Sequence, residues 1–325
     1  MWVAVGEGTN HTIAYSNDGI IWTGLGKSIF DYTSSTDIGG GLGVAWNGTM
    51  WVAVGYGTNN SIAYSYDGIT WTGANASKSI FSNFCNDIAW NGTNWIAVGS
   101  GNNSIAYSSD GINWIGAKTS AGGPSTDIFK HFAHGIDWDG KVWVAVGDGD
   151  THSIAYSSDV NGWTGATGPT TIFSNHGLGV AWNGKMWVAV GSGTDNSIAY
   201  SSDGISWTGA TGINGSSKSI FSEYGVDIAW NGKRWVAVGQ GTNHTIAYSS
   251  DGIKWNGLGK TIFDDTSPTG SSGNGVAGNP NVGSTIVDSV ITLNKNTNKL
   301  DIVADSYYNT GYSEFSIDII ANESN

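Results

Sequence analysis

Asparagine and histidine side chains recur in short clusters along this chain, and such groups can bind a polar ligand. A carboxamide offers a hydrogen-bond donor and an acceptor together, and an imidazole adds a further donor or acceptor. Close to aromatic rings, which stack on the apolar faces of sugars, these groups are suited to a glycan. The candidate ligand-binding residues are Asn10, His11, Asn59, Asn60, Asn102, Asn103, His152, Asp195, Asn196, Asn243 and His244.

The same residue types also have a purely structural interpretation, because Asn commonly closes turns with its own side chain. Both interpretations are open from the sequence alone. If the clusters do bind a ligand, their repetition predicts up to six similar sites. A multivalent glycan would then be held well through effective concentration even where each site is weak.

A repeated phrase positions these residues. Trp-Val-Ala-Val-Gly, or a close variant, begins at Trp2, Trp51, Trp95, Trp143, Trp187 and Trp235, so successive copies are 49, 44, 48, 44 and 48 residues apart. A period in the forties with several short strands in each unit is typical of a β-propeller. The sequence therefore predicts an all-β, six-bladed β-propeller built from four-stranded antiparallel blades.

Four short strands fit each repeat. The first ends in a Trp followed by Asn-Gly or Asp-Gly, as at Trp46-Asn47-Gly48, which predicts a tight hairpin. The second, Trp-Val-Ala-Val-Gly, is apolar on both faces and is expected to lie between neighbouring blades. The third is Ser/Thr-Ile-Ala-Tyr-Ser, and the fourth is expected to end at a Trp such as Trp71. An Ile-Phe pair in each linker, such as Ile128-Phe129, predicts an apolar plug between blades.

The phrase between the third and fourth strands, for example Ser65-Tyr66-Asp67-Gly68-Ile69-Thr70-Trp71, resembles the Asp-box of the BNR repeat family. That family includes sialidase-like propellers, and the resemblance covers about residues 2–279. It implies a hairpin in which the Asp carboxylate caps backbone N–H groups and the Trp packs the blade. The Asp-to-Trp spacing here is one residue shorter than in the family, and in the fourth copy Gly162 has moved. The residues assigned to structural turns are Asp18, Asp67, Asp110, Asp159, Asp203 and Asp251.

Catalysis is disfavoured by the residues present. Family members with sialidase activity clamp a carboxylate with three arginines, whereas this chain has one, Arg234, and lysine does not reproduce the bidentate fork. Nothing pairs Glu7, Asp148 or Asp150 as the acid and base of a glycosidase. His131 and His134 form too small a set to predict a metal centre. We therefore expect no enzyme, no metal and no cofactor.

Composition narrows the choice of partners. The formal net charge is −13 and the 13 Lys and Arg residues show no cluster in the sequence, so nucleic acid and anionic membranes are disfavoured. No apolar run approaches the roughly 20 residues that span a bilayer. The single cysteine, Cys85, excludes an internal disulfide. Localisation is not determined, with the extracellular space or a virion surface favoured.

The two ends of the chain complete the architecture. The first repeat lacks its first strand, and residues 276–278 (Val-Ala-Gly) are expected to supply it beside Trp2, closing the ring. The alternative is a separate, incomplete seventh blade. The expected domains are the propeller, 1–283, and a C-terminal β extension, 284–325. Within the extension, residues 285–293, 299–305 and 314–320 are predicted to form strands.

The leading functional hypothesis is a non-catalytic recognition module. It would bind glycans or a protein surface in a multivalent way, through the face that carries the loops after the second and fourth strands. The alternative is a structural or surface-display protein, a virion or cell-surface head that oligomerises through 284–325. A glycoside hydrolase ranks third.

Overall fold

The structure is a computed structural model that describes residues 1–31, 39–168, 172–212, 215–260, 263 and 275–276, together with two short strands at 291–294 and 299–302. The chain divides into two compact units, Met1–Val282 and Gly283–Asn325. The first unit holds the repeats. No helix within the described ranges is both long enough and apolar enough to cross a membrane.

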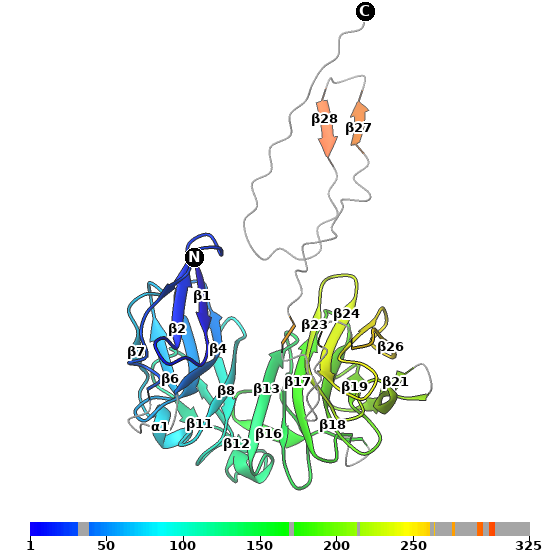
Figure 1. Ribbon diagram of the computed structural model, residues 1–325, viewed down its shortest axis with the longest axis horizontal. Coiled ribbons are helices and arrows are strands. Elements are labelled where there is room, and N and C mark those ends of the chain that lie inside the picture. The colour runs from blue at the N-terminus through cyan, green and yellow to red at the C-terminus, as the bar shows by residue number, and fades with distance from the viewer. Residues whose placement is uncertain are drawn as a thin grey trace, which may run out of the picture. The chain divides into compact units, whose positions relative to one another are not determined.

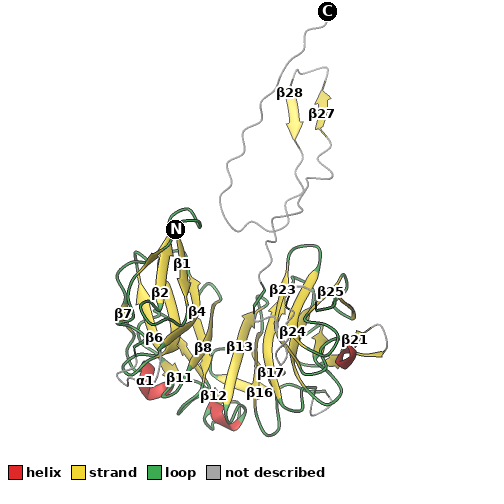
Figure 2. Cartoon of the chain, viewed as in Figure 1, coloured by secondary structure: helices red, strands yellow, loops and turns green. Residues whose placement is uncertain are grey.

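The described part of the first unit is all-β apart from three short helical turns, and its sheets follow one another along the chain (Figures 1 and 2). Each repeat forms one antiparallel meander, because every strand pairs with the next in sequence. Sheet 1 has three strands, β1 (Trp2–Val5), β2 (Ile13–Ser16) and β3 (Thr23–Gly24). Sheet 2 has four, β4 (Gly40–Trp46), β5 (Trp51–Tyr56), β6 (Ile62–Ser65) and β7 (Thr72–Gly73).

The remaining sheets repeat this plan. Sheet 3 contains β8 (Cys85–Trp90), β9 (Trp95–Gly99), β10 (Ile105–Ser108) and β11 (Ile115–Gly116). Sheet 4 contains β13 (Phe132–Trp138), β14 (Trp143–Asp148), β15 (Ile154–Ser157) and β16 (Gly162–Gly165). Sheet 5 contains β17 (His176–Trp182), β18 (Trp187–Ser192), β19 (Ile198–Ser201) and β20 (Thr208–Gly209). Sheet 6 contains β23 (Tyr224–Trp230), β24 (Trp235–Gln240), β25 (Ile246–Ser249) and β26 (Lys254–Gly257).

Linkers join each sheet to the next. Two short linker strands, β12 (Lys118–Thr119) and β21 (Thr211–Gly212), add in parallel to the outer strands β16 and β26 of the following sheets, and β22 (Gly215–Ser216) pairs with β21. The helical turns α1 (Ser77–Ile80), η1 (Ser125–Asp127) and η2 (Ser217–Ser219) also lie in linkers, where the sequence indicated no helix.

The core lies between sheets. The second strand of sheets 3 to 5 is almost wholly buried along its length, as expected of a strand covered on both faces. Five linker phenylalanines are at most 2% exposed and pack with aromatic residues of the sheet that follows, which confirms the predicted plug; they are Phe30, Phe81, Phe129, Phe173 and Phe221. In the sixth linker Phe263 is 38% exposed, and Ile262 lies outside the described residues.

The inner strands β4, β8, β13, β17 and β23 contact one another in chain order. Each carries a β-bulge near its start, for example between Ala133 and Gly135. We call the sheet end where the inner strands begin the linker end, and the opposite end, which holds the inner hairpins 47–50, 91–94, 139–142, 183–186 and 231–234, the hairpin end.

The predicted tight hairpins are present, whereas an expectation about the outer strands was wrong. The inner hairpin is a four-residue turn, in which Gly48 has φ +99° while Asn47 Oδ1 accepts the backbone N–H groups of Thr49 and Met50 at 2.9 and 2.7 Å. The outer strand of sheet 2 begins after Trp71 instead of ending there, because the residues before it bond within their own turn and Thr72 is the first to pair with Tyr64.

The first sheet shows three strands where four were expected. Of the residues expected to supply its inner strand, Val276 is described and is not in a strand, while 277 and 278 lie outside the described residues. In the second unit, β27 (Ile291–Asn294) pairs antiparallel with β28 (Lys299–Ile302), within two of the three predicted segments. The third predicted strand, 314–320, lies outside the described residues.

Candidate functional site

The eleven residues predicted to bind ligand lie in six separate loops, each between the second and third strands of one sheet. Within each loop, the side chain of the residue two positions before the third strand occupies the space beside a glycine of the outer strand in the same sheet. A Cβ atom built on Gly73 would be 1.9 Å from Asn60 Oδ1, and one on Gly165 would be 2.4 Å from His152 Cγ. The other pairs are His11 with Gly24, Asn103 with Gly116, Asn196 with Gly209 and His244 with Gly257.

Hydrogen bonds tie several of these side chains into their loops. Nδ1 of His11 accepts the backbone N–H of Gly26 at 2.9 Å, and Nδ1 of His244 accepts that of Gly259 at the same distance. The preceding residue in each loop is exposed: Asn10, Asn59, Asn102, Asp195 and Asn243. The six clusters are therefore one per sheet, and the fold does not bring them together.

The six aspartates assigned to turns share one geometry. Asp203 Oδ1 accepts the backbone N–H groups of Ile205 and Ser206 at 2.9 and 2.8 Å and the Ser201 hydroxyl at 2.9 Å. Equivalent bonds reach the carboxylates of Asp18, Asp67, Asp110, Asp159 and Asp251. Partial burial would raise the pKa of Asp110, but the bonds from Asn113 and Ile112 outweigh it and lower that pKa to about 2.

The shifted glycine of the fourth copy has a visible consequence. In sheet 3 the Trp114 indole N–H donates to the Gly111 carbonyl at 3.1 Å, and Trp22, Trp71, Trp207 and Trp255 make the same bond. Trp163 is fully buried, and its Nε1 has no hydrogen-bond partner in the described structure. Val160 stands at the offset that Gly111 holds in sheet 3, and it lacks the positive φ of Gly111 (+72°), so the backbone of this turn follows a different path.

A row of aromatic and imidazole rings crosses four neighbouring sheets at the linker end, and the sequence interpretation missed it. Tyr56 ends β5, Phe84 precedes β8, Phe132 and His134 lie in β13, and His176 begins β17. Their ring centroids are separated in turn by 4.9, 6.3, 5.7 and 6.3 Å. Phe84, Phe132 and the two histidines are half-buried, so the row keeps an accessible edge. We call these five residues the ring row.

Polar groups accompany the ring row. The Tyr56 hydroxyl donates to the Glu7 carboxylate, and Asp148 pairs across the strands with Phe132 and acts electrostatically on both histidines. Burial, with repulsion from His176, lowers the pKa of His134 to about 4. Burial also lowers the pKa of His176. Both imidazoles are therefore neutral at pH 7, each with one donor and one acceptor nitrogen.

Three carboxylates lie deeper, on the inner strands themselves. Each accepts the next backbone N–H of its own strand and one N–H from the neighbouring inner segment: Asp87 from Ile136 at 3.1 Å and Asp137 from Trp182 at 2.8 Å. Asp227 does the same with Val276 at 2.8 Å. Burial, with the nearby charges of Asp137 and Asp227, raises the pKa of Asp87 to about 7. Burial raises the pKa of Asp137 to about 6.

The residues considered for catalysis or metal binding are not assembled into one site. Glu7 bonds Tyr56, whereas the exposed Asp150 pairs with Lys130 at 2.8 Å. His131 is exposed, away from the half-buried His134. No group of three or more His, Cys, Asp or Glu side chains is placed to hold a metal ion within the described ranges.

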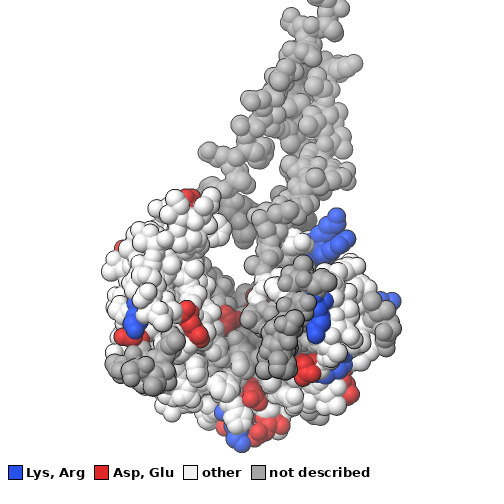
Figure 3. All heavy atoms as spheres, viewed as in Figure 1, with Lys and Arg blue, Asp and Glu red and all other residues white. Residues whose placement is uncertain are grey.

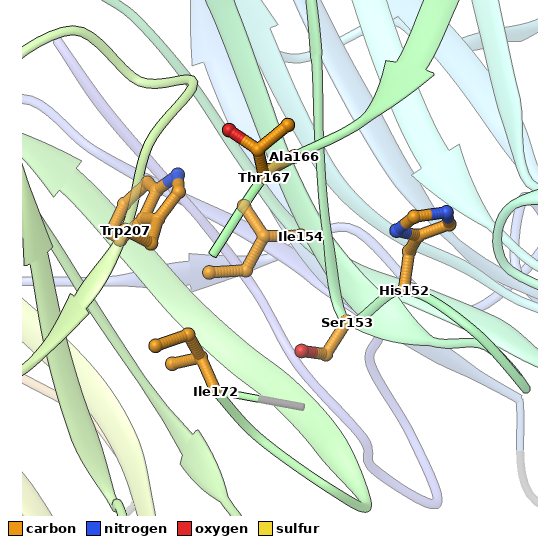
Figure 4. Close-up of a pocket in the computed structure, with 7 residues that line it drawn as sticks. All are labelled: His152, Ser153, Ile154, Ala166, Thr167, Ile172 and Trp207. Carbon is orange, nitrogen blue, oxygen red and sulfur yellow. The ribbon is translucent and has the colours of Figure 1, made fainter. Parts of the chain in front are cut away.

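Small pockets lie between sheets, and one of them includes a predicted residue. Figure 4 shows the residues that line it: His152, Ser153, Ile154, Ala166, Thr167, Ile172 and Trp207. Its empty space of about 260 Å³ includes open solvent. At the corresponding place after sheet 3, the Ser125 hydroxyl accepts the backbone N–H groups of Ser104 and Ile105, whereas residues 169–171 of this linker lie outside the described residues.

The ring row has a signal in the sequence that appears only when the repeats are aligned. Phe84, Phe132, His176 and Tyr224 each stand six residues before the Trp that ends their inner strand. Aromatic and imidazole residues at this one position of the aligned repeats lie outside the phrases that form the core. Their recurrence would have predicted a ring cluster at the linker end.

Comparison with known proteins supports the fold. No protein-family model and no curated protein matches the sequence. Among solved structures, the chain is similar to the GH74 xyloglucanase of Xanthomonas campestris, with 18% identity, a TM-score of 0.50 and coverage of 77% of this chain; it spans 36% of the xyloglucanase chain. A nidogen–laminin complex matches at 11% identity and a TM-score of 0.49, covering 85% of this chain and 98% of that one. The computationally designed protein Ika8 matches at 9% identity and a TM-score of 0.46, covering 76% and 70%.

The xyloglucanase neighbour is a β-propeller, and this chain repeats its kind of four-stranded sheet. At 18% identity the likeness shows the fold alone. The protein is therefore an all-β chain with a propeller-like fold.

Proposed function

We propose that this chain is a non-catalytic recognition module that binds a glycan at the linker end, along the ring row. The observation that supports the proposal is the continuity of five rings from four sheets, with centroid separations between 4.9 and 6.3 Å, on a half-buried surface. Aromatic rings that are not needed to fill a core commonly mark a binding surface.

The chemistry around the row suits a sugar. Half-buried rings provide apolar faces, and the two neutral imidazoles can each exchange hydrogen bonds with a hydroxyl group. The Glu7 and Asp148 carboxylates, at either side of the row, are acceptors for further hydroxyl protons. The exposed Asn residues of the loops lie at the same end of the sheets and would extend contact with a longer glycan.

We also propose how the six sheets are arranged and how the ring closes. We take the sheets to be blades of an Asp-box-like propeller of six blades whose ring closes between sheet 6 and sheet 1. The Asp227–Val276 hydrogen bond repeats the Asp87–Ile136 bond at the same separation of 49 residues, which supports a position for Val276 equivalent to that of an inner strand. Trp2 is 60% exposed, whereas Trp95, Trp143, Trp187 and Trp235 are fully buried by neighbouring sheets. Closure would supply the cover that Trp2 lacks.

A glycan-array screen of the full chain tests the recognition proposal, followed by titration of any hit. Phe132→Leu keeps apolar volume but removes the ring face, and His134→Gln keeps a neutral polar group without the imidazole. We expect each to weaken binding at least tenfold while the melting temperature stays within a few degrees. Tyr66→Leu, which removes an exposed ring at the hairpin end, is the matched control and should leave the affinity unchanged.

A blank array, or binding that survives both ring-row substitutions, would count against this site. The second candidate is then a structural head. It is favoured by the separate unit Gly283–Asn325 with its β27–β28 hairpin, which would serve as the oligomerisation or attachment element. Light scattering of the full chain and of a chain ending at residue 282 would show a change in oligomeric state only under that alternative.

A further inference from the structure

The hairpin end of sheets 4 to 6 presents three indoles that keep part of their surface open. Trp138, Trp182 and Trp230 end the inner strands β13, β17 and β23, and each packs on the Trp that begins the next strand, with ring centroids 4.8, 5.2 and 5.3 Å apart. The partner indoles are fully buried, whereas these three are half-buried. One indole of each pair therefore serves the core and the other meets solvent.

A lysine follows each of these indoles by three residues. Lys141, Lys185 and Lys233 are all exposed. They are 44 and 48 residues apart in sequence and look dispersed, but those distances equal the repeat spacing, and β13, β17 and β23 pack side by side. The fold thus places the three cations on successive hairpins of one end.

Arg234 adds a fourth positive charge at the last hairpin. It is exposed, and its guanidinium lies 5.4 Å from the centre of the Tyr248 ring, an arrangement that leaves its charge available. We call the three tryptophans, the three lysines and Arg234 the basic indole arc. In sheets 2 and 3 the lysine position is held by Thr49 and Thr93, so the arc is confined to sheets 4 to 6.

The cations of the arc are not used for internal ion pairs. Within the described ranges the ion pairs are Lys27–Asp31, in a linker, and Lys130–Asp150, between a linker and a loop of sheet 4, so neither involves a lysine of the arc. Asp139 is the one carboxylate in the hairpins 139–142, 183–186 and 231–234, and its Oδ1 accepts the backbone N–H groups of Lys141 and Val142. Figure 3 shows that neutral side chains make up most of the described surface on the face drawn there, in line with the 12% of charged residues in the sequence.

Other carboxylates limit the extent of this surface. The turn aspartates Asp159, Asp203 and Asp251 lie between the third and fourth strands of the same sheets, and each Oδ1 accepts two backbone N–H groups. An anionic ligand is therefore expected to follow the inner hairpins and avoid the outer turns. Such a path suits a narrow chain.

We propose that the basic indole arc binds an acidic polysaccharide, with a sugar ring on the open face of each indole and a sulfate or carboxylate beside each lysine. The repeated Trp-to-Lys spacing matches a polymer whose apolar sugar faces and anionic groups also repeat. Nucleic acid is a different polyanion, and the net charge of −13 acts against both polymers, so a single-stranded DNA oligonucleotide is included among the probes below.

Dextran sulfate and uncharged dextran form a matched pair of probes for the full chain. We expect dextran sulfate to bind, dextran not to bind, and the dextran sulfate Kd to rise with ionic strength. The triple variant Lys141→Glu, Lys185→Glu, Lys233→Glu should raise this Kd at least tenfold. Because all three side chains are exposed, its melting temperature should stay close to that of the original chain.

The control is a second triple variant, Lys27→Glu, Lys118→Glu, Lys130→Glu, which changes the net charge equally but lies in linkers. It should retain most of the binding. Trp182→Leu, which keeps apolar packing, should weaken dextran sulfate binding without abolishing its salt dependence.

Equal loss of binding in both triple variants would reduce the effect to net charge and overturn the proposal, as would no binding of dextran sulfate at low salt. Tighter binding of a single-stranded DNA oligonucleotide than of dextran sulfate would assign the arc to nucleic acid instead. Phe132→Leu should leave dextran sulfate binding unchanged, so failure here is distinguishable from failure at the ring row.

Discussion

The carboxylate of Asp227 accepts the backbone N–H of Val276 at 2.8 Å, and in doing so joins the last inner strand to a segment 49 residues further along the chain. Asp87 makes the same contact with Ile136, which lies in the inner strand of the following sheet. This equivalence supports the proposal that Val276 belongs to a fourth strand of sheet 1.

Ring closure can be trapped by a disulfide. Val44 pairs with Ala53 in sheet 2, so the equivalent partner of Val276 is Ala4. In a Cys85→Ser background, Ala4→Cys with Val276→Cys should form an intramolecular disulfide under mild oxidation, seen as a monomer of altered mobility on non-reducing gels. A covalent dimer would instead show that the open edge is shared between copies, and failure to oxidise would count against closure.

The inner carboxylates should give stability an unusual dependence on pH. Burial raises the pKa of Asp87 from 3.8 to about 7, so between these values the folded chain retains a proton that the unfolded chain has released. The free energy of unfolding should therefore fall as pH rises from about 4 to about 7. Denaturant titrations at several pH values measure this slope.

Asp87→Asn should flatten that slope, because an amide cannot ionise, and the variant should gain relative stability above pH 7. Asp150→Asn is the control, since that exposed carboxylate pairs only with Lys130 and its pKa is lowered, first by the hydrogen bond from that lysine. At lower pH the turn aspartates act in the opposite direction: their pKa values are lowered, so their stabilisation is lost as pH falls below about 4. An unchanged slope in Asp87→Asn would contradict this account.

A phenylalanine of the linker plug should contribute more to the free energy of unfolding than an exposed aromatic residue does. Phe129 is fully buried, so Phe129→Ala should lower the free energy of unfolding by about 3–5 kcal/mol through lost burial and a residual cavity. Tyr66→Ala, at a side chain that is 64% exposed, should change it by less than about 1 kcal/mol. Comparable losses in the two variants would show that the plug does not act as described.

The turn aspartates should stabilise their own sheets. Asp203→Ala removes the acceptor for two backbone N–H groups and should cost about 1–2 kcal/mol, comparable to the loss of a helix cap. Asp150→Ala, which removes only an exposed ion pair, should lower the stability less than Asp203→Ala does. Thermal unfolding of the two variants side by side is sufficient to compare them.

Much of the architecture follows from local patterns. The Trp spacings predicted the repeated sheets, and the Ile-Phe pairs predicted the buried plugs, because burial periodicity and turn chemistry are properties of neighbouring residues. The same local reasoning failed at the outer strands: those of sheets 1, 2, 3 and 5 begin after their Trp, and those of sheets 4 and 6 continue past it.

Less of the candidate site could be predicted from local sequence patterns. His152 and Asn60 looked like ligand-binding groups, and the structure lays them over Gly165 and Gly73 of their own sheets. Because glycine has no Cβ, it leaves space for a side chain from the neighbouring loop, but only after the two strands have paired. The separate sequence segments do not show this contact.

By itself, the sequence determined the repeat, the strands, the turns and the plugs, since each depends on residues within one period. Only the tertiary structure decided which columns of the repeat meet. Phe84 and Phe132 come together, as do the hairpins of Lys141 and Lys185, because stacked sheets make neighbours of residues 44 to 49 positions apart. No local hydrogen bond or hydrophobic period encodes that proximity, which arises when the faces of successive sheets are buried against one another.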